Sequence, residues 1–318
     1  MKHTWITLVL VGITTLGAAA LAEDPARPGT LNYVEGTAYL QGKLLTSKDI
    51  GSTELHTGQM LTTGEGKAEM LLTPGVFLRL DDNSAIKMVS PKLLQTQIEL
   101  VQGKVAVEVD EIHPENDLEI LVGGVRTQMI DNGYYEFDAS HPMAMVFKGK
   151  AAVATGNDKY KIIKGSQEYA LSDGFTGKPT HFDESAKEDE LYKWSNLRSQ
   201  YLAEANNQMA GDYVGAGYAP GWFWDPYGFD YTYIGMGPMW SPFGFGFYPF
   251  GFGGFGGYGG FGGFYGGGYG GYYGRGGYGR GGFGGGVARP GMSGGMAHVG
   301  GGMHGGGVGM HGGGGGHR

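Results

Sequence analysis

The stretch LHTGQMLTTGEGKAEMLLTPGVFLRLDDNSAI, residues 55–86, decides the fold class of this chain. Its apolar runs are short, and each is closed by a glycine or by a polar turn. Apolar side chains recur at every second position in two of these runs, namely at Ala68, Met70 and Leu72 and then at Val76, Leu78 and Leu80. A period of two is typical of β-strands that bury one face. The stretch therefore predicts all-β architecture.

Similar strands are predicted on both sides of this stretch, each with an internal glycine. They read YVEGTAYL at 33–40, VQGKVAVEV at 101–109 and VFKGKAAV at 146–153. Glycine inside an alternating strand indicates a bend or a close approach of two backbones. The glycines Gly36, Gly103, Gly149 and Gly165 are 67, 46 and 16 residues apart. This spacing excludes a fixed-period repeat and predicts an irregular stack of short strands, solenoid-like or sandwich-like.

Glycine is distributed unevenly along the 318 residues. Only 19 of the 66 glycines lie in residues 1–210, and the other 47 lie in residues 211–318. A segment so rich in glycine loses much entropy on ordering and cannot bury a conventional core. We therefore expect a β domain at 23–180, an amphipathic helix at 181–210 and a disordered, low-complexity tail at 211–318.

Cysteine content and charge exclude several classes of function. The chain has no cysteine, which excludes disulfides, thiolate catalysis and zinc–thiolate sites. Residues 23–230 hold 18 basic and 31 acidic residues, a net charge of −13, whereas residues 231–318 hold four arginines and no acid. An acidic folded part argues against nucleic acid as a partner.

The N-terminus has the pattern of a secretory signal peptide. Lys2 precedes a mostly apolar run at 5–16, and Ala20-Leu21-Ala22 provides the small-x-small cleavage site. The apolar run is shorter than the roughly 20 residues that a membrane-spanning helix needs. We therefore expect removal of residues 1–22, a mature protein in the periplasm or at the cell surface, and no membrane span after cleavage.

Three blocks of the sequence resemble those of a known family. Residues 55–84 follow LxxGxxLxTGxxxAxxxL and then GxxLxLxxxS, residues 98–109 follow LxLxxGxVxVxV, and residues 147–167 follow VxxGxVxV and LxxGQ. These blocks resemble the FecR-like domain, and the resemblance covers residues 32–171. It implies an extracytoplasmic all-β module, known from iron-uptake signalling proteins and from many exported bacterial proteins. Residues 129–137, MIDNGYYEF, depart from the family's glycine-threonine-x-phenylalanine element.

Members of this family that relay iron signals to sigma factors also carry a cytoplasmic segment and a spanning helix. Neither is expected here, so the resemblance implies the fold and an extracytoplasmic binding role rather than sigma-factor regulation.

One helix is predicted over residues 183–208. Ser185 and Glu188 have the spacing of a capping box. Apolar side chains then recur every three or four positions, at Leu191, Trp194, Leu197, Tyr201, Leu202 and Ala205. We expect this helix to cover an exposed edge of the strand stack, where it would block edge-to-edge pairing. The alternative is a helix that binds a partner.

Beyond residue 211 the sequence predicts neither helix nor regular strand, although residues 222–252 are aromatic enough to form a compact cluster. Two arginines lie in motifs that resemble RGG repeats, but two copies favour a spacer over a nucleic-acid site. We expect the tail to mediate association through Trp222, Trp224, Trp240, Arg275 and Arg280.

Candidate chemical sites are not supported by spacing. Asp81 and Asp82 belong to a turn sequence, and the histidines at 56, 113, 141 and 181 are scattered singly. A tail cluster of histidine and methionine lacks preorganised geometry; its members are His298, Met303, His304, Met310, His311 and His317. We predict no catalytic residue, no cofactor and no metal.

The sequence thus predicts an exported, non-enzymatic protein of the bacterial envelope. The FecR-like module would bind or scaffold, and the tail would mediate association with an envelope protein or with itself. The alternative is a carbohydrate- or cell-wall-binding module in which the tail aromatics stack on polysaccharide. A regulator in extracytoplasmic signalling is the third function considered.

Overall fold

A computed structural model describes residues 26–156, 159–213 and 220–249 of the chain. The predicted signal peptide, Arg275, Arg280 and the tail beyond residue 249 lie outside these residues. The described strands are β1 Leu31–Leu40, β2 Lys43–Leu44, β3 Met60–Leu71, β4 Val76–Leu80, β5 Ala85–Lys92, β6 Gln95–Gln102, β7 Lys104–Val109, β8 Asp117–Val122, β9 Val125–Met129, β10 Gly133–Asp138, β11 Met143–Lys148, β12 Lys150–Ala154, β13 Tyr160–Lys164, β14 Gln167–Ala170, β15 Thr180–His181, β16 Gly221–Asp225, β17 Asp230–Ile234, β18 Met239–Trp240 and β19 Gly246–Phe247. The helices are the 3₁₀ turn Ser47–Asp49, α1 Glu184–Lys187 and α2 Glu190–Tyr213.

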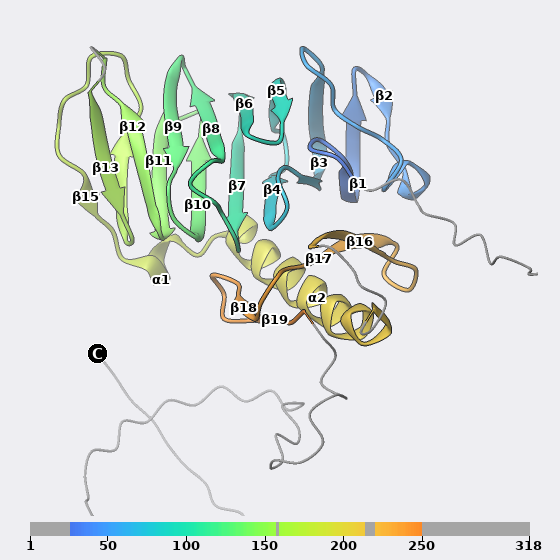
Figure 1. Cartoon of the computed structure of the whole chain (residues 1–318). Helices are drawn as coiled ribbons and strands as arrows, with labels where there is room; N and C mark the ends of the chain where they lie inside the picture. Colours follow the sequence, from blue (N-terminus) through green and yellow to red (C-terminus); the bar gives the residue numbers. More distant parts are fainter. Residues whose placement is uncertain (1–25, 157–158, 214–219, 250–318) are drawn as a thin grey trace, which may run out of the picture. The chain divides into compact units, whose positions relative to one another are not determined.

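Strands β1 to β15 form one sheet (Figure 1). Its main path runs β13-β12-β9-β8-β6-β5-β3-β4-β7-β10-β11-β14-β15, and β1 pairs with β3 and β2 beside this path. Only β6 and β8 pair in parallel among the described strands. Strand β3 pairs with β5 through residues 60–62 and with β4 through residues 68–71, so it divides the sheet into two arms.

The two arms enclose one hydrophobic core. Ile120 and Val153 of the first arm belong to the same buried cluster as Leu78 and Val107 of the second. The alternation predicted in residues 68–80 is confirmed, because the side chains named for it all belong to this core, whereas Leu71 and Phe77 belong to another cluster. The all-β prediction is therefore confirmed.

The other face of the second arm is buried as well. Helix α2 runs across the strands of this arm (Figure 1) and contacts β7. Leu71, Phe77 and Ala106 point away from the main core and pack in two further clusters that include α2 residues. We call this surface the helix face. The predicted helix therefore covers a sheet face, and the expectation that it covers an edge is wrong.

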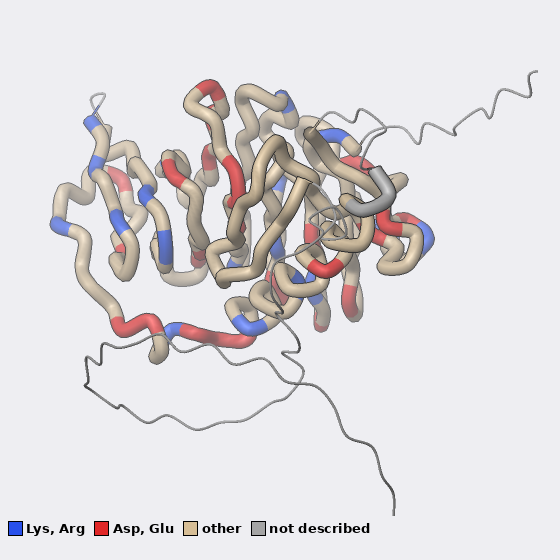
Figure 2. Tube along the Cα trace, turned by 60° about the horizontal axis from the view of Figure 1, so that its bottom comes forward, with Lys and Arg blue, Asp and Glu red and all other residues tan. Residues whose placement is uncertain are grey.

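The helical segment also differs from the prediction at its start. It breaks into α1 and α2, and Asp183 caps α1 by accepting a hydrogen bond from the Ser185 backbone N–H at 3.1 Å. Glu188 follows the last residue of α1, so the predicted capping box is absent. This break lies in an acidic segment at residues 183–190, and Figure 2 colours the Asp and Glu positions of the Cα trace red.

The buried side of α2 is more polar than the apolar spacing predicted. Leu191, Trp194, Leu202 and Ala205 are buried as expected, but Leu197 and Tyr201 are 46% and 54% exposed. The polar residues Ser195, Arg198, Ser199 and Asn206 are buried in their place. Three of them, Arg198, Ser199 and Asn206, form hydrogen bonds to side chains or backbone groups of other elements. The amphipathic pattern of a helix places polar residues on the solvent side and therefore does not predict their burial.

Two hairpins follow α2, where the sequence predicted no regular strand. β16 pairs with β17, and β18 pairs with β19. Trp222 of β16 packs edge-on against Phe77 of β4, with ring centroids 5.1 Å apart. The aromatic cluster expected after residue 222 is confirmed in part. Trp222, Tyr231, Tyr233 and Phe247 gather against the sheet and α2, whereas Tyr227, Phe229 and Trp240 are mostly exposed. No helix in the described ranges is long and apolar enough to cross a membrane.

Candidate functional site

Charged side chains lie buried at the centre of the helix face. Glu69 of β3 stands opposite Arg79 of β4 in the strand register. Arg79 donates from Nε to Glu69 Oε2 at 2.7 Å and from Nη1 to Glu108 Oε2 of β7. All three side chains are fully buried. Hydrogen bonds between ionised groups are about twice as strong as neutral ones, so these strands present a fixed set of acceptors to α2.

Helix α2 binds to this set through two adjacent residues. Arg198 Nη2 donates to Glu69 Oε1 at 2.8 Å and to Asp230 Oδ2 of β17 at 2.7 Å. Ser199 Oγ donates to Glu108 Oε1 at 2.6 Å. We call Glu69, Arg79, Glu108, Arg198 and Asp230 the charge network. It joins the sheet, the helix and the first hairpin.

Hydrogen bonds to buried amides strengthen the same junction. Asn32 of β1 donates from Nδ2 to Glu69 Oε1 and to the Tyr231 carbonyl, and its Oδ1 accepts from the Tyr231 N–H at 2.7 Å. Asn206 of α2 donates to the Tyr233 carbonyl and accepts from the Tyr248 N–H, each at 2.7 Å. The helix and both hairpins are thereby fixed to β1 and to each other.

Burial and neighbouring charge shift the pKa values of these acids in opposite directions. Burial raises the pKa of Glu69, but Arg198 and Arg79 outweigh it and hold the pKa at about 2. Burial, with Asp189 nearby, raises the pKa of Glu136 to about 8. Burial and the adjacent Glu108 raise the pKa of Asp110 well above its usual range. Glu136 is therefore mainly protonated at neutral pH.

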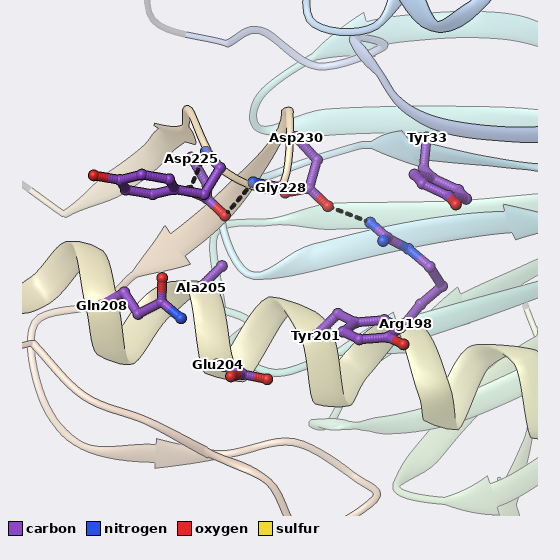
Figure 3. A pocket seen from close by; sticks show the side chains of 10 residues that line it. Tyr33, Arg198, Tyr201, Glu204, Ala205, Gln208, Asp225, Gly228 and Asp230 are labelled. Carbon is purple, nitrogen blue, oxygen red and sulfur yellow. Dashed lines mark hydrogen bonds and ion pairs between the residues drawn. The ribbon is translucent and has the colours of Figure 1, made fainter.

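A surface pocket of about 420 Å³ opens beside the charge network, between α2 and the turn that joins β16 to β17 (Figure 3). We call it the aromatic pocket. Its lining comprises Tyr33, Arg198, Tyr201, Glu204, Ala205, Gln208, Asp225, Tyr227, Gly228 and Asp230. The α2 members recur every three or four residues, with Glu204 and Ala205 adjacent, which places them on one side of the helix. Arg198 lies over the ring of Tyr33, 4.1 Å from its centroid.

The turn at residues 225–230 forms the opposite wall of the aromatic pocket. Asp225 accepts hydrogen bonds from the backbone N–H groups of Tyr227 and Gly228, each at 2.9 Å. A Cβ at Gly228 would lie 2.6 Å from Asp225 Oδ2 and 2.9 Å from Asp230 Oδ1, so glycine is needed between the two carboxylates. Tyr227 and Phe229 remain 78% and 65% exposed. The turn therefore combines buried carboxylates with exposed aromatic rings.

Several polar groups of the aromatic pocket have no partner among the described residues. They are Asp230 Oδ1 and the side-chain polar atoms of Tyr33, Tyr201, Glu204 and Gln208. The pocket therefore offers hydrogen-bonding capacity that the described chain does not use.

The predicted association residues fall in different environments. Trp222 is only 8% exposed and packs against Phe77 and Tyr233, which leaves little of its ring free to contact a partner. Trp224 is partly buried against Tyr231, with centroids 5.1 Å apart. Trp240 is 63% exposed. Their association role, like that of Arg275 and Arg280, stays a prediction.

The sequence did not predict the aromatic pocket or the charge network. A usable signal was Phe77-Leu78-Arg79-Leu80, where a charged residue sits among apolar neighbours on both sides. Within the described ranges, no group of three or more histidine or acidic side chains is arranged to hold a metal ion.

Comparison with known proteins identifies the β region. Residues 58–152 match the sequence pattern of the family described as FecR protein, so the chain carries a FecR domain, and the predicted resemblance is confirmed. The search of curated proteins finds no match. Every residue that lines the aromatic pocket lies outside the matched segment.

Two crystal structures of a protein from Parabacteroides distasonis, described as a "putative anti-sigma factor", are weakly similar to this chain. Their identities are 9% and 8%, and both have a TM-score of 0.33. Each match covers 44% of this chain and 64% of the other. This chain thus spans less than two-thirds of those proteins, and a likeness of this degree carries no conclusion about function.

Proposed function

We propose that this chain is an exported, non-enzymatic binding and scaffolding module of the bacterial envelope, in which the FecR domain supports the aromatic pocket. The observation that carries the proposal is the pocket, where exposed rings and unused polar groups are held on a fixed frame. Small-ligand sites are usually preformed hollows with apolar walls and a few polar groups that set orientation. The FecR match and the predicted signal peptide support a location in the envelope.

The frame supports a binding role because it cannot easily move. Arg198 is tied to the sheet and to the hairpin, and Asn206 is tied to both hairpins. A pocket whose walls are fixed before binding loses little conformational entropy when a ligand enters.

The state of the pocket carboxylates supports a non-enzymatic role. Asp225 uses both oxygens to hold the turn, and Asp230 uses one oxygen for Arg198. Hydrolysis by paired carboxyl groups needs one acid and one base or nucleophile, both free to react. Among the pocket acids of the described chain, only Glu204 has both oxygens free.

Association through the tail completes the proposed function. Trp240 is the tryptophan best exposed for it in the described chain, and Arg275 and Arg280 supply positive charge further along the sequence. An envelope protein is the partner that we propose. Repeated weak contacts on one chain raise avidity through effective concentration.

A cell-wall polysaccharide is the second candidate ligand. The exposed rings of Tyr201 and Tyr227 favour it, because an aromatic face can stack on the apolar face of a sugar while Glu204 and Gln208 bond its hydroxyls. The FecR match also keeps a role in extracytoplasmic signalling under consideration as a third function.

A binding experiment with the full-length protein tests the main proposal. Envelope proteins, insoluble peptidoglycan and cellulose are each incubated with the protein and with the double variant Tyr201→Ala/Tyr227→Ala. We expect capture by the protein fraction and loss of that capture in the double variant. The control is Tyr160→Ala, which removes a tyrosine that is 55% exposed on β13. Capture by peptidoglycan or cellulose alone would favour the second candidate. Equal capture of the native protein and the double variant would exclude the pocket as the site.

A further inference from the structure

We propose that the aromatic pocket binds the guanidinium group of an arginine side chain, carried on a basic peptide segment of its partner; this rests on the binding function proposed above. The ligand class follows from the charge, the free carboxylate oxygen and the stacking geometry of the pocket.

The charge of the pocket lining selects a cation. Glu204, Asp225 and Asp230 are acidic, and Arg198 is the only basic residue that lines the pocket. Arg198 is already shared between Asp230 and Glu69, so its charge is compensated inside the protein. A lining with excess negative charge repels anionic ligands and attracts cationic ones.

One carboxylate oxygen of the pocket lining has no partner among the described residues. Asp230 is only 4% exposed and gives Oδ2 to Arg198, while no described residue donates to Oδ1. A carboxylate oxygen can only accept. A ligand group that reaches Oδ1 must therefore be a donor, and a positively charged donor gives the strongest bond.

The protein itself shows that a guanidinium fits this chemistry. Arg198 stacks on Tyr33 and donates to Asp230 (Figure 3). It also donates to Glu69. The pocket lining also contains the same kinds of group in exposed positions, namely the rings of Tyr201 and Tyr227 and the free carboxylate of Glu204. A second guanidinium would stack on an exposed ring and donate to Asp230 Oδ1 and Glu204. Arg198 makes the same kinds of contact with Tyr33, Asp230 Oδ2 and Glu69.

Arginine fits better than lysine or a neutral sugar. A guanidinium is planar, stacks on aromatic faces and has five donors, whereas an ammonium is compact and strongly hydrated. Sugar hydroxyls could bond the polar groups of the lining, but they carry no charge and would not compensate its excess negative charge. The pocket volume of about 420 Å³ leaves room for the side chain and part of its flanking backbone.

The test measures binding of a fluorescent glycine-serine peptide with two arginines to the full-length protein. A second peptide carries citrulline in place of arginine, which keeps the shape and removes the charge, and a third carries lysine. We expect the citrulline peptide to bind at least about tenfold more weakly than the arginine peptide, and the lysine peptide to lie between them. Equal binding of the arginine and citrulline peptides would overturn the assignment.

Matched variants locate the site. Tyr201→Ala and Glu204→Gln should each weaken the arginine peptide by about two- to fivefold. Tyr160→Ala and Glu115→Gln, both at exposed positions away from the pocket, should leave binding unchanged. All four changes affect exposed side chains, and thermal unfolding curves verify that each variant is folded. Arginine binding that ignores Tyr201→Ala and Glu204→Gln would place the site elsewhere and overturn the assignment.

The outcomes for ligand class and for function are separable. If Tyr201→Ala abolishes capture by envelope material but the arginine peptide does not bind, the ligand class is wrong and the binding function stands. A neutral oligosaccharide that binds in place of the arginine peptide would likewise overturn the ligand class and leave the binding function intact. If envelope capture ignores Tyr201→Ala as well, both are wrong.

Discussion

Residues 58–152 form strands that pair with one another across a long sheet, whereas residues 220–249 form strands that pair only within their own hairpins. The first region supplies most of the core that lies between the two arms of the sheet. The second region buries its aromatic rings against the first region and α2. The difference teaches that the FecR domain acts as a foundation, and that the later residues are structured by what they cover.

Deleting the hairpins should have the largest effect on this relationship. A chain ending at residue 210 loses Trp222, Tyr231, Tyr233 and Phe247, and each such buried side chain contributes roughly 1.5 to 3 kcal/mol. The deletion also leaves Arg198 without Asp230. We expect a large fall in the denaturation midpoint and aggregation through the uncovered helix face. The matched control is a chain ending at residue 249, and equal midpoints for the two chains would show that the hairpins are not part of the fold.

Breaking the charge network should come next. Arg79→Met leaves Glu69 and Glu108 buried without their shared cation, and removing one partner of a buried ion pair costs roughly 3 to 5 kcal/mol. Chemical denaturation measures the loss. Arg126→Met, at an exposed position of β9, is the control. Adding Glu108→Gln to Arg79→Met should recover part of the stability, and a double variant less stable than the single one would contradict this account.

Two tryptophans separate covering residues from surface residues. Trp222→Ala should cost roughly 3 to 5 kcal/mol, because the buried ring contacts Phe77 and Tyr233. Trp240→Ala should change the free energy of unfolding by no more than about 0.5 kcal/mol, because the ring is mostly exposed. Urea unfolding of both variants checks the difference. Similar losses would mean that Trp222 does not support the helix face.

The smallest effect, counted per pH unit, should be a dependence of stability on pH that comes from Glu136 in the first region. Glu136 is protonated in the folded state up to a pKa of about 8, while the same group ionises near 4.5 when unfolded. Its contribution to stability is therefore fully present below pH 4.5 and is lost as the pH rises to 8. The slope is at most about 1.4 kcal/mol per pH unit.

Glu136→Gln should flatten this part of the pH profile and raise the relative stability at pH 8. Unfolding midpoints between pH 5 and 8.5 measure the slope for the native chain and the variant. Glu115→Gln, at an exposed position, should leave the slope unchanged. An unchanged slope in Glu136→Gln would assign the pH dependence to other groups. Asp110 is one such group, because it is also a buried carboxyl with a raised pKa.

The main core could be predicted from the sequence because its rule is local. Val76, Leu78 and Leu80 alternate, and a strand with one apolar face buries that face. Phe77 and Arg79 occupy the other positions of the same strand, where alternation predicts solvent. They are buried because α2 packs on this face, and nothing in the sequence of the strand indicates that packing. The same reason explains the polar buried side of α2.

The aromatic pocket could not be predicted because its walls come from distant parts of the chain. Asn32 and Tyr231, which fix the hairpin to β1, are 199 residues apart in sequence. The glycine and aromatic composition after residue 211 also resembles a disordered tail, since a short hairpin in such a background has no distinct periodicity. The spacing along the helix places Tyr201 among the apolar side chains that should be buried, but its ring is 54% exposed.

The late position of Asp230 has a consequence for how the protein is made. A ribosome adds roughly 5 to 20 residues per second, so roughly 8 to 30 s separate the synthesis of Arg79 from that of Asp230. The strands of the sheet are made first, α2 follows, and the hairpin that carries Asp230 is made after both. A sheet that folds before residue 230 is available has its charged face incompletely covered, and the residues that complete the cover are made late.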